Sequence, residues 1–135
     1  MNKERLVRDI YHRGVIFCKP DTPLHELVRI MADAGIHAVM VAEHEGDAPI
    51  GVVSHTDAIA HYGEDLAALR ARDVMTTGVI SICENEPVTA AVRRLLEKGI
   101  NRMLVVSEAG KPLGILSTTD IIRDMHDARW VWHLR

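Results

Sequence analysis

Residues 51–57 read Gly-Val-Val-Ser-His-Thr-Asp, and residues 114–120 read Gly-Ile-Leu-Ser-Thr-Thr-Asp. The likeness extends outward from this pair. Residues 8–60 align with residues 72–123 at an offset of 64, which falls to 63 after a one-residue difference near Ala48. Of the 52 aligned positions 18 are identical, and many of these are glycine or polar rather than apolar. The chain therefore contains an internal duplication, in which two like units can bury their apolar faces together.

The duplication sets the predicted domain organisation of the 135-residue chain. Each copy of about 60 residues would be marginal alone, whereas a domain of the full length buries roughly two thirds of its unfolded surface. We therefore predict one module over residues 1–135. Its predicted parts are repeat one at about 6–62, a linker at about 63–71, repeat two at about 72–125 and a C-terminal tail at 126–135.

Composition and charge restrict the class of protein. The formal net charge of −3 argues against broad nucleic-acid binding, which needs a basic surface. No apolar run approaches the ~20 residues that span a bilayer. No apolar segment of a secretory signal follows Met1–Arg5. Cys18 and Cys83 have no CxxC partner, so we expect free thiols. By default we expect a cytoplasmic protein without membrane attachment.

Each copy is predicted to fold as strand, helix, strand, strand, helix. Thr22 is a candidate N-cap with Pro23 at the first helical position, and Gly35 suits the end of that helix. Pro87 and Gly99 occupy the same places in the second copy. The expected strands are 15–17, 38–42, 50–53, 103–106 and 113–116, and the closing helices begin near Thr56 and Asp120.

The order of these features resembles a known family, the cystathionine-β-synthase (CBS) domain pair or Bateman module. The features are an Arg-Asp-Val-Met-Thr opening at 72–76, a proline-initiated helix, a Gly-Ile-Asn-Arg-Met-Leu-Val-Val stretch at 99–106, and the closing motif at 114–120. Each is weak alone, but the same order occurs in both copies over residues 6–124. The first copy departs where it has Asp-Ile-Tyr-His at 9–12 and Ala38 in place of Arg102.

The resemblance implies an α/β (α+β) fold of tandem CBS repeats, each β-α-β-β-α, packed sheet to sheet with pseudo-twofold symmetry. Members of the family often hold AMP, ADP, ATP, S-adenosylmethionine or NAD in clefts between the repeats. They usually regulate other activities rather than catalyse reactions, and standalone pairs commonly form homodimers.

The resemblance also implies two ligand clefts, each lined by residues from both repeats. Asp57 and Asp120 would accept hydrogen bonds from a ribose diol, and the guanidinium of Arg102 would bind phosphate. Because Ala38 offers no charge, we expect the two clefts to differ. The first cleft would use Ser54, Thr56, Asp57, Ile80, Ser81, Asn101 and Arg102. The second would use Ile16, Phe17, His37, Ser117, Thr119 and Asp120.

Each of these residues also has a purely structural interpretation. A single Ser-x-Thr-Asp is most simply the start of a helix, because Ser, Thr and Asp are common caps. Gly51 and Gly114 favour either close approach of a ligand or tight packing, about equally. Arg102 taken alone is most simply a surface ion-pair residue. The two copies in register favour at least one ligand site.

The sequence therefore predicts a regulatory, ligand-sensing module for an AMP, ADP or ATP class of ligand, acting on an unidentified effector protein. The eight histidines show no metal-ligand spacing, and no catalytic motif is present, so we expect neither a metal site nor an enzyme. A homodimer is expected from the apolar terminal helix (Ile121, Ile122, Met125) with Trp130 and Trp132. The alternatives are a dimerisation or partner-docking module with vestigial clefts, or a site for S-adenosylmethionine or NAD.

Overall fold

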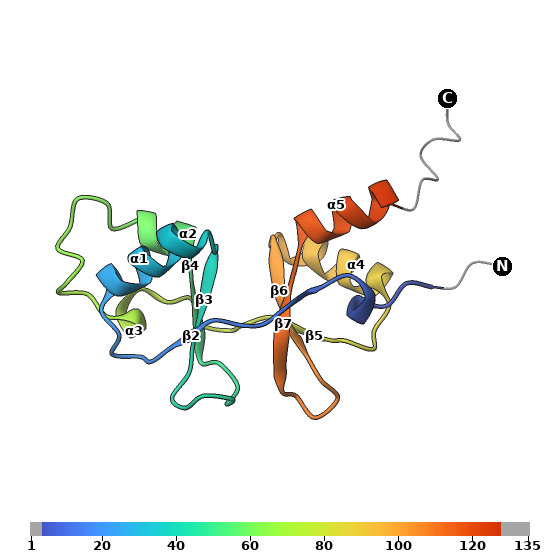
Figure 1. Ribbon diagram of the computed structural model, residues 1–135, viewed down its shortest axis with the longest axis horizontal. Helices are drawn as coiled ribbons and strands as arrows, with labels where there is room; N and C mark the ends of the chain where they lie inside the picture. The colour runs from blue at the N-terminus through green and yellow to red at the C-terminus, as the bar shows by residue number, and fades with distance from the viewer. Residues whose placement is uncertain (1–3, 128–135) are drawn as a thin grey trace. The chain divides into compact units, whose positions relative to one another are not determined.

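The computed structural model describes residues 4–127, which form two compact units. Unit 1 takes its described residues from Met1–Gly14 and Ile80–Arg135, and unit 2 is Val15–Val79. In each unit the helices cover one face of a β-sheet (Figure 1). The mixture of helices and strands, repeated along the chain, confirms the predicted fold class.

Unit 2 is built on a three-stranded sheet in the order β2-β3-β4. The strands are β2 (Phe17–Cys18), β3 (Ala38–Val41) and β4 (Gly51–Ser54); the helices are α1 (Leu24–Ala34), α2 (His55–Ile59) and α3 (Ala71–Val74). β2 is parallel to β3, and β3 is antiparallel to β4. Leu24 and Leu27 are fully buried against the sheet. Full burial of such a side chain contributes about 1.5–3 kcal/mol.

Unit 1 contains a four-stranded sheet in the order β1-β7-β6-β5. Its elements are the 3₁₀ turn η1 (Val7–Asp9), β1 (His12–Arg13), β5 (Ser81–Cys83), α4 (Val88–Lys98), β6 (Arg102–Val106), β7 (Pro112–Ser117) and α5 (Thr118–Asp127). β6 is parallel to β5 and antiparallel to β7, the same pattern as in unit 2. The core combines Val7 and Tyr11 with the inner residues of the strands and of α4.

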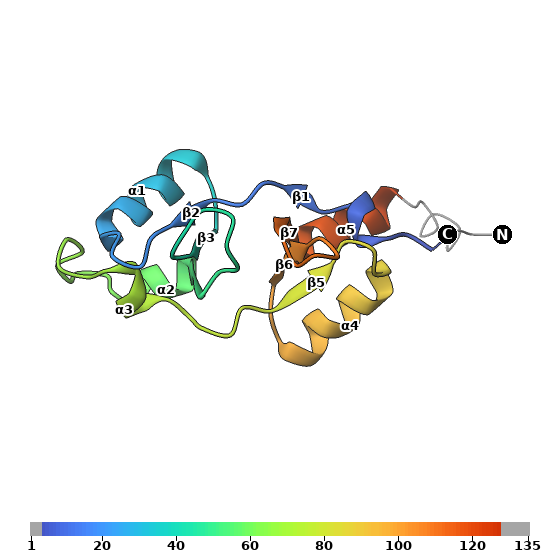
Figure 2. The same cartoon turned by 90° about the horizontal axis from the view of Figure 1, so that it is seen from below.

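The opening segment of each repeat packs on the core of the other repeat. β1, from the start of the chain, lies beside β7 (Figure 2) and pairs with it antiparallel. In this pairing His12 lies opposite Ile115. In unit 2, α3 contributes to the core, and Thr76 forms a bridge with Val52 of β4. Strand β1 was absent from the predicted pattern, because a two-residue strand leaves no alternation for the sequence to reveal.

Gly51 and Gly114 allow these opening segments to approach the sheets. A Cβ built on Gly51 would lie 2.5 Å from the Met75 sulfur, and one on Gly114 would overlap the backbone oxygen of His12. Both glycines are buried within their own unit. Of the two alternatives left open by the sequence, close packing of the chain on itself is the one that the contacts support.

Both long helices begin one residue later than predicted, at Leu24 and Val88, and both end where expected. The N-cap of α1 is Pro23 rather than Thr22, and the Thr22 hydroxyl instead accepts a hydrogen bond from the Lys19 N–H at 3.1 Å. α1 ends at Gly35 and α4 at Gly99, which adopt left-handed φ angles of 65° and 61°. Such φ angles are accessible to glycine without steric cost.

Both cysteines are free thiols, and both are half-buried. Between residues 4 and 127, no helix has the length and apolar character needed to cross a membrane. Trp130 and Trp132, which contributed to the homodimer prediction, lie outside the described residues.

Candidate functional site

Asp57 and Asp120 each close a capping box where a strand passes directly into a helix. Oδ2 of Asp57 accepts hydrogen bonds from the Ser54 N–H at 2.8 Å and the Ser54 hydroxyl at 2.9 Å. Oδ2 of Asp120 accepts the same pair from Ser117, at 2.8 and 3.2 Å. The serine hydroxyls in turn lie 3.4 Å from the aspartate N–H groups. The helix-start interpretation of both motifs is therefore correct, and each carboxylate is held in place.

The second oxygen of each carboxylate, Oδ1, contacts the opening segment of the other repeat. Thr76 Oγ1 donates to Oδ1 of Asp57 at 2.8 Å, and His12 Nδ1 lies 2.6 Å from Oδ1 of Asp120. His12 and Thr76 are equivalent positions of the two repeats, 64 residues apart. One copy thus offers an imidazole where the other offers a hydroxyl.

The two carboxylates differ in accessibility. Asp120 is 4% exposed, whereas Asp57 is half-buried. An ionised carboxylate has about four acceptor sites, so Asp57 keeps the capacity to accept further hydrogen bonds. A ligand could reach Asp120 only by displacing a neighbouring group such as His12. Of the two predicted ribose anchors, Asp57 is the more available.

Arg102 is a half-buried cation at the first position of β6. It lies directly across the sheet from Ser117 of β7, in the same unit as Asp120. Burial lowers the pKa of the Arg102 guanidinium, yet an arginine remains charged at neutral pH. Among residues 4–127, no hydrogen bond or ion pair engages this guanidinium. The surface ion pair that would be its simplest explanation is therefore not formed in the described part of the chain.

The equivalent corner of unit 2 has imidazoles in place of the guanidinium. Ala38 lies opposite Ser54, as Arg102 lies opposite Ser117. The rings of His37 and His55 meet edge to face with centroids 4.5 Å apart. Nε2 of His55 lies 3.0 Å from the Ile36 carbonyl oxygen, which requires the proton on Nε2. The asymmetry expected from Arg102 and Ala38 thus extends to the neighbouring side chains.

The other polar candidates lie near these corners. Thr56 and Thr119 are exposed in the first turns of α2 and α5. Asn101 is exposed, and its carbonyl oxygen accepts a hydrogen bond from the Thr118 N–H at 2.9 Å. Ser81 is exposed on β5, and its carbonyl accepts a hydrogen bond from Arg94 Nη1 at 2.9 Å. Ile80 is half-buried against the core of unit 1.

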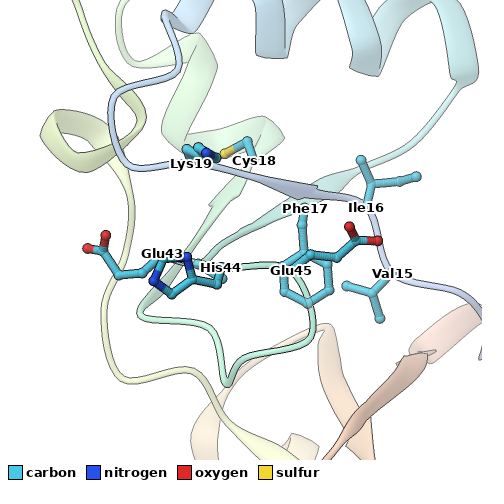
Figure 3. A pocket seen from close by; sticks show the side chains of 9 residues that line it. Val15, Ile16, Phe17, Cys18, Lys19, Glu43, His44 and Glu45 are labelled. Atoms are coloured by element: carbon cyan, nitrogen blue, oxygen red, sulfur yellow. The ribbon is translucent and has the colours of Figure 1, made fainter.

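Ile16 and Phe17 line a pocket of about 400 Å³ within unit 2. Val15 and Phe17 point to one side of the chain, and Ile16 points to the other (Figure 3). The rest of the lining includes Lys19 and the loop after β3, residues 42–45. This loop could not be predicted as a lining element, because three exposed polar residues between strands resemble any solvated turn.

The structure divides the predicted residues between the units. Unit 1 holds Ile80, Ser81, Asn101, Arg102, Ser117, Thr119 and Asp120, and unit 2 holds Ile16, Phe17, His37, Ser54, Thr56 and Asp57. Within the range 4–127, no three metal-ligating side chains come together. The assignment of Arg102 to the Asp57 site stays a prediction. What each unit offers by itself is a helix start with an ordered carboxylate beside the first residue of a strand.

Comparison with known proteins identifies the family to which this architecture belongs. Residues 7–64 and 71–127 match the CBS domain. A curated relative is an uncharacterized protein of Methanopyrus kandleri, 32% identical over 87% of this chain. Another is the L-aspartate semialdehyde sulfurtransferase of Methanosarcina acetivorans, 25% identical over 86% of this chain. The chain spans 61% of the first relative's length and 23% of the second's.

Solved structures share the fold. One is a CBS domain pair in complex with 5′-methylthioadenosine and S-adenosyl-L-methionine, with a TM-score of 0.82 and 21% identity, covering 93% of this chain and 99% of that one. The protein CBSX2 in complex with AMP has a TM-score of 0.77 and 23% identity, covering 93% and 98%. The chain belongs to the CBS domain family, and its two repeats form a CBS domain pair.

Proposed function

We propose that this CBS pair is a regulatory module that senses an adenosine nucleotide of the AMP, ADP or ATP class and has no catalytic activity of its own. The observation that carries the proposal is the half-buried guanidinium of Arg102, which makes no hydrogen bond or ion pair with any residue of the described range 4–127. Removing part of a charge from water costs free energy unless hydrogen bonds or a counter-charge compensate. A phosphate supplies both, in the planar two-point geometry that a guanidinium favours.

The ribose would bind at a helix start. Asp57 is the candidate anchor, because its carboxylate is already oriented by Ser54 and Thr76 and is more exposed than that of Asp120. The exposed hydroxyl of Thr56 adds a donor and acceptor in the same turn. Relatives of the same fold were solved with AMP and with ATP, which supports a nucleotide as the ligand class.

S-adenosylmethionine, or another adenosyl compound without a phosphate group, is the alternative ligand. It follows from the complex of the CBS pair with 5′-methylthioadenosine, and it would need no phosphate partner. The guanidinium of Arg102 has no side-chain partner in the described part of the chain, which favours the phosphorylated ligand over this alternative.

Signalling would proceed through a partner. A ligand changes the balance between two conformations of a protein only if it binds them with different affinities. The signal then reaches an effector protein only if that protein recognises one of the two conformations. We also expect a homodimer, since Ile59 is 67%, Tyr62 94% and Met125 43% exposed on or beside helices. Light scattering tests the dimer, and a mass of 15.0 kDa at all concentrations would contradict it.

Thermal denaturation with a panel of nucleotides tests the ligand class. AMP, ADP or ATP should raise the melting temperature, and the matching guanosine compounds should raise it little. A ligand present at 100 times its dissociation constant adds about 2.7 kcal/mol to the free energy of unfolding. Absence of a shift with every adenosine compound would favour a docking module whose ligand sites are vestigial.

A further inference from the structure

The opening segments of the two repeats reach their carboxylates in the same register. His12 of β1 lies opposite Ile115 of β7. Thr76 forms a bridge with Val52 of β4, which is the position equivalent to Ile115. Ile115 and Ser117 are two positions apart on β7, so their side chains and that of His12 lie on one face of the sheet. Both repeats have therefore kept the geometry of the contact, and the contacting side chain is what differs.

The imidazole of His12 lies on the solvent side of the Asp120 carboxylate. The side chain of His12 is 61% exposed and that of Asp120 is 2% exposed, with 2.6 Å between Nδ1 and Oδ1. Because an ionised carboxylate only accepts hydrogen bonds, Nδ1 carries the proton of this contact. Oδ2 already accepts hydrogen bonds from the N–H and the hydroxyl of Ser117. Both oxygens are engaged, and almost none of the side chain is left for a solute to reach.

Asp57 has the same capping box but remains more accessible. Its Oδ1 accepts a hydrogen bond from Thr76 Oγ1 at 2.8 Å, and the residue is half-buried. A threonine hydroxyl fills one acceptor position of that oxygen and leaves another. An imidazole places a whole ring against the carboxylate. The difference between histidine at position 12 and threonine at position 76 therefore accounts for one closed and one open helix start.

We propose that His12 closes the helix start at Asp120 to ligands, so that the CBS pair binds a single adenosine ligand, anchored at Asp57. A ribose at Asp120 has to displace the imidazole, whereas a ribose at Asp57 can add to the contacts already present. His12 thus determines which of the two carboxylates takes a ligand. The choice of adenosine rests on the proposed function, whereas the closure rests on the contacts of His12 alone.

Carboxylate labelling tests the closure without any ligand. A carbodiimide with glycine ethyl ester converts accessible carboxylates into amides, which peptide mass spectrometry locates. In the native protein Asp57 should be labelled and Asp120 should not. His12→Thr keeps a hydroxyl donor for Oδ1, as Thr76 does, and should allow labelling of Asp120. Arg13→Thr, at the next position of β1 and also exposed, is the matched control and should leave Asp120 unlabelled.

Calorimetric titration with adenosine tests the consequence for binding. The native protein and Arg13→Thr should bind one adenosine per chain, and His12→Thr should bind two. The reciprocal variant, Thr76→His, should bind none, because both helix starts are then closed. Circular dichroism verifies that each variant is folded.

The closure by His12 would be overturned if native Asp120 were labelled as fast as Asp57, or if Asp120 stayed unlabelled in a folded His12→Thr variant. Two adenosines bound by the native protein, or only one bound by His12→Thr, would also overturn the proposal. If labelling follows the expected pattern but neither the native protein nor His12→Thr binds adenosine, the proposed function fails while the closure by His12 stands.

Discussion

Nδ1 of His12 lies 2.6 Å from Oδ1 of Asp120, a carboxylate that is 4% exposed at the start of α5. The imidazole comes from the opening of the first repeat and the carboxylate from the end of the second. In unit 2 the same connection is made by Thr76 and Asp57 at 2.8 Å. The duplication has thus kept the contact between opening segment and helix start while changing its chemistry.

Loss of the His12 contact should destabilise the protein more than loss of its counterpart. His12→Ala leaves one oxygen of the buried Asp120 without its partner, at a cost of about 1–3 kcal/mol. Thr76→Ala should cost less, because water can reach the half-buried Asp57. Urea unfolding of the two variants measures both values. Equal losses would show that burial of the carboxylate does not set the cost.

Substitution of the two strand glycines, Gly51 and Gly114, should destabilise the protein to different extents. Gly114→Ala would place its Cβ against the backbone oxygen of His12, and backbone can yield only by moving β1. Gly51→Ala would meet mainly the flexible Met75 side chain, at 2.5 and 2.8 Å. We expect Gly114→Ala to cost about 3 kcal/mol or more and Gly51→Ala about 1 kcal/mol. Thermal or urea unfolding of the pair gives the comparison, and the reverse order would contradict the packing described.

The Cys18 thiol should react slowly and make stability depend on alkaline pH. Burial raises its pKa to about 11 from an ordinary value of 9.0, an effect partly offset by a hydrogen bond with Thr22. Below about pH 9 both native and unfolded states keep the proton. Between about pH 9 and 11 only the native state keeps it, so the free energy of unfolding falls as pH rises.

Two single-cysteine variants separate these effects. In Cys83→Ala, labelling of the remaining Cys18 by a thiol reagent should be slow at pH 8 and accelerate toward pH 11. Cys18→Ala should lose part of the decline in stability between pH 9 and 11. Fast labelling of native Cys18 at pH 8 would show that this thiol is more exposed than the structure indicates.

Asp57 and Asp120 should contribute unequally to ligand binding. Asp57→Ala should weaken AMP and adenosine alike, because it removes the proposed ribose anchor. Asp120→Ala should weaken AMP less, since that carboxylate is enclosed by Ser117 and His12. Calorimetric titration of both variants, with their folding checked, decides between the sites. If Asp120→Ala abolishes AMP binding and Asp57→Ala does not, Arg102 works with the aspartate of its own unit.

The sequence predicts the local elements well because their signals are local. The Ser-x-x-Asp spacing anticipates both capping boxes, and Gly35 and Gly99 mark helix ends by their conformational freedom. The partners of the carboxylates could not be foreseen. His12 and Thr76 reach Asp120 and Asp57 only because each opening segment crosses to the other repeat's sheet, through a strand of two residues or a single bridge. Such long-range pairings leave no periodicity in the sequence.

The strongest single test of the proposed function is a calorimetric titration of AMP and adenosine into the native protein and into Arg102→Ala. A hydrogen bond to a charged group contributes about 1.5–3 kcal/mol. Arg102→Ala should therefore weaken AMP more than about ten-fold and leave adenosine nearly unchanged. Because the guanidinium has no partner in the described chain, the variant without ligand should be about as stable as the native protein. Equal affinity of native protein and variant for AMP would contradict the proposal that Arg102 binds phosphate.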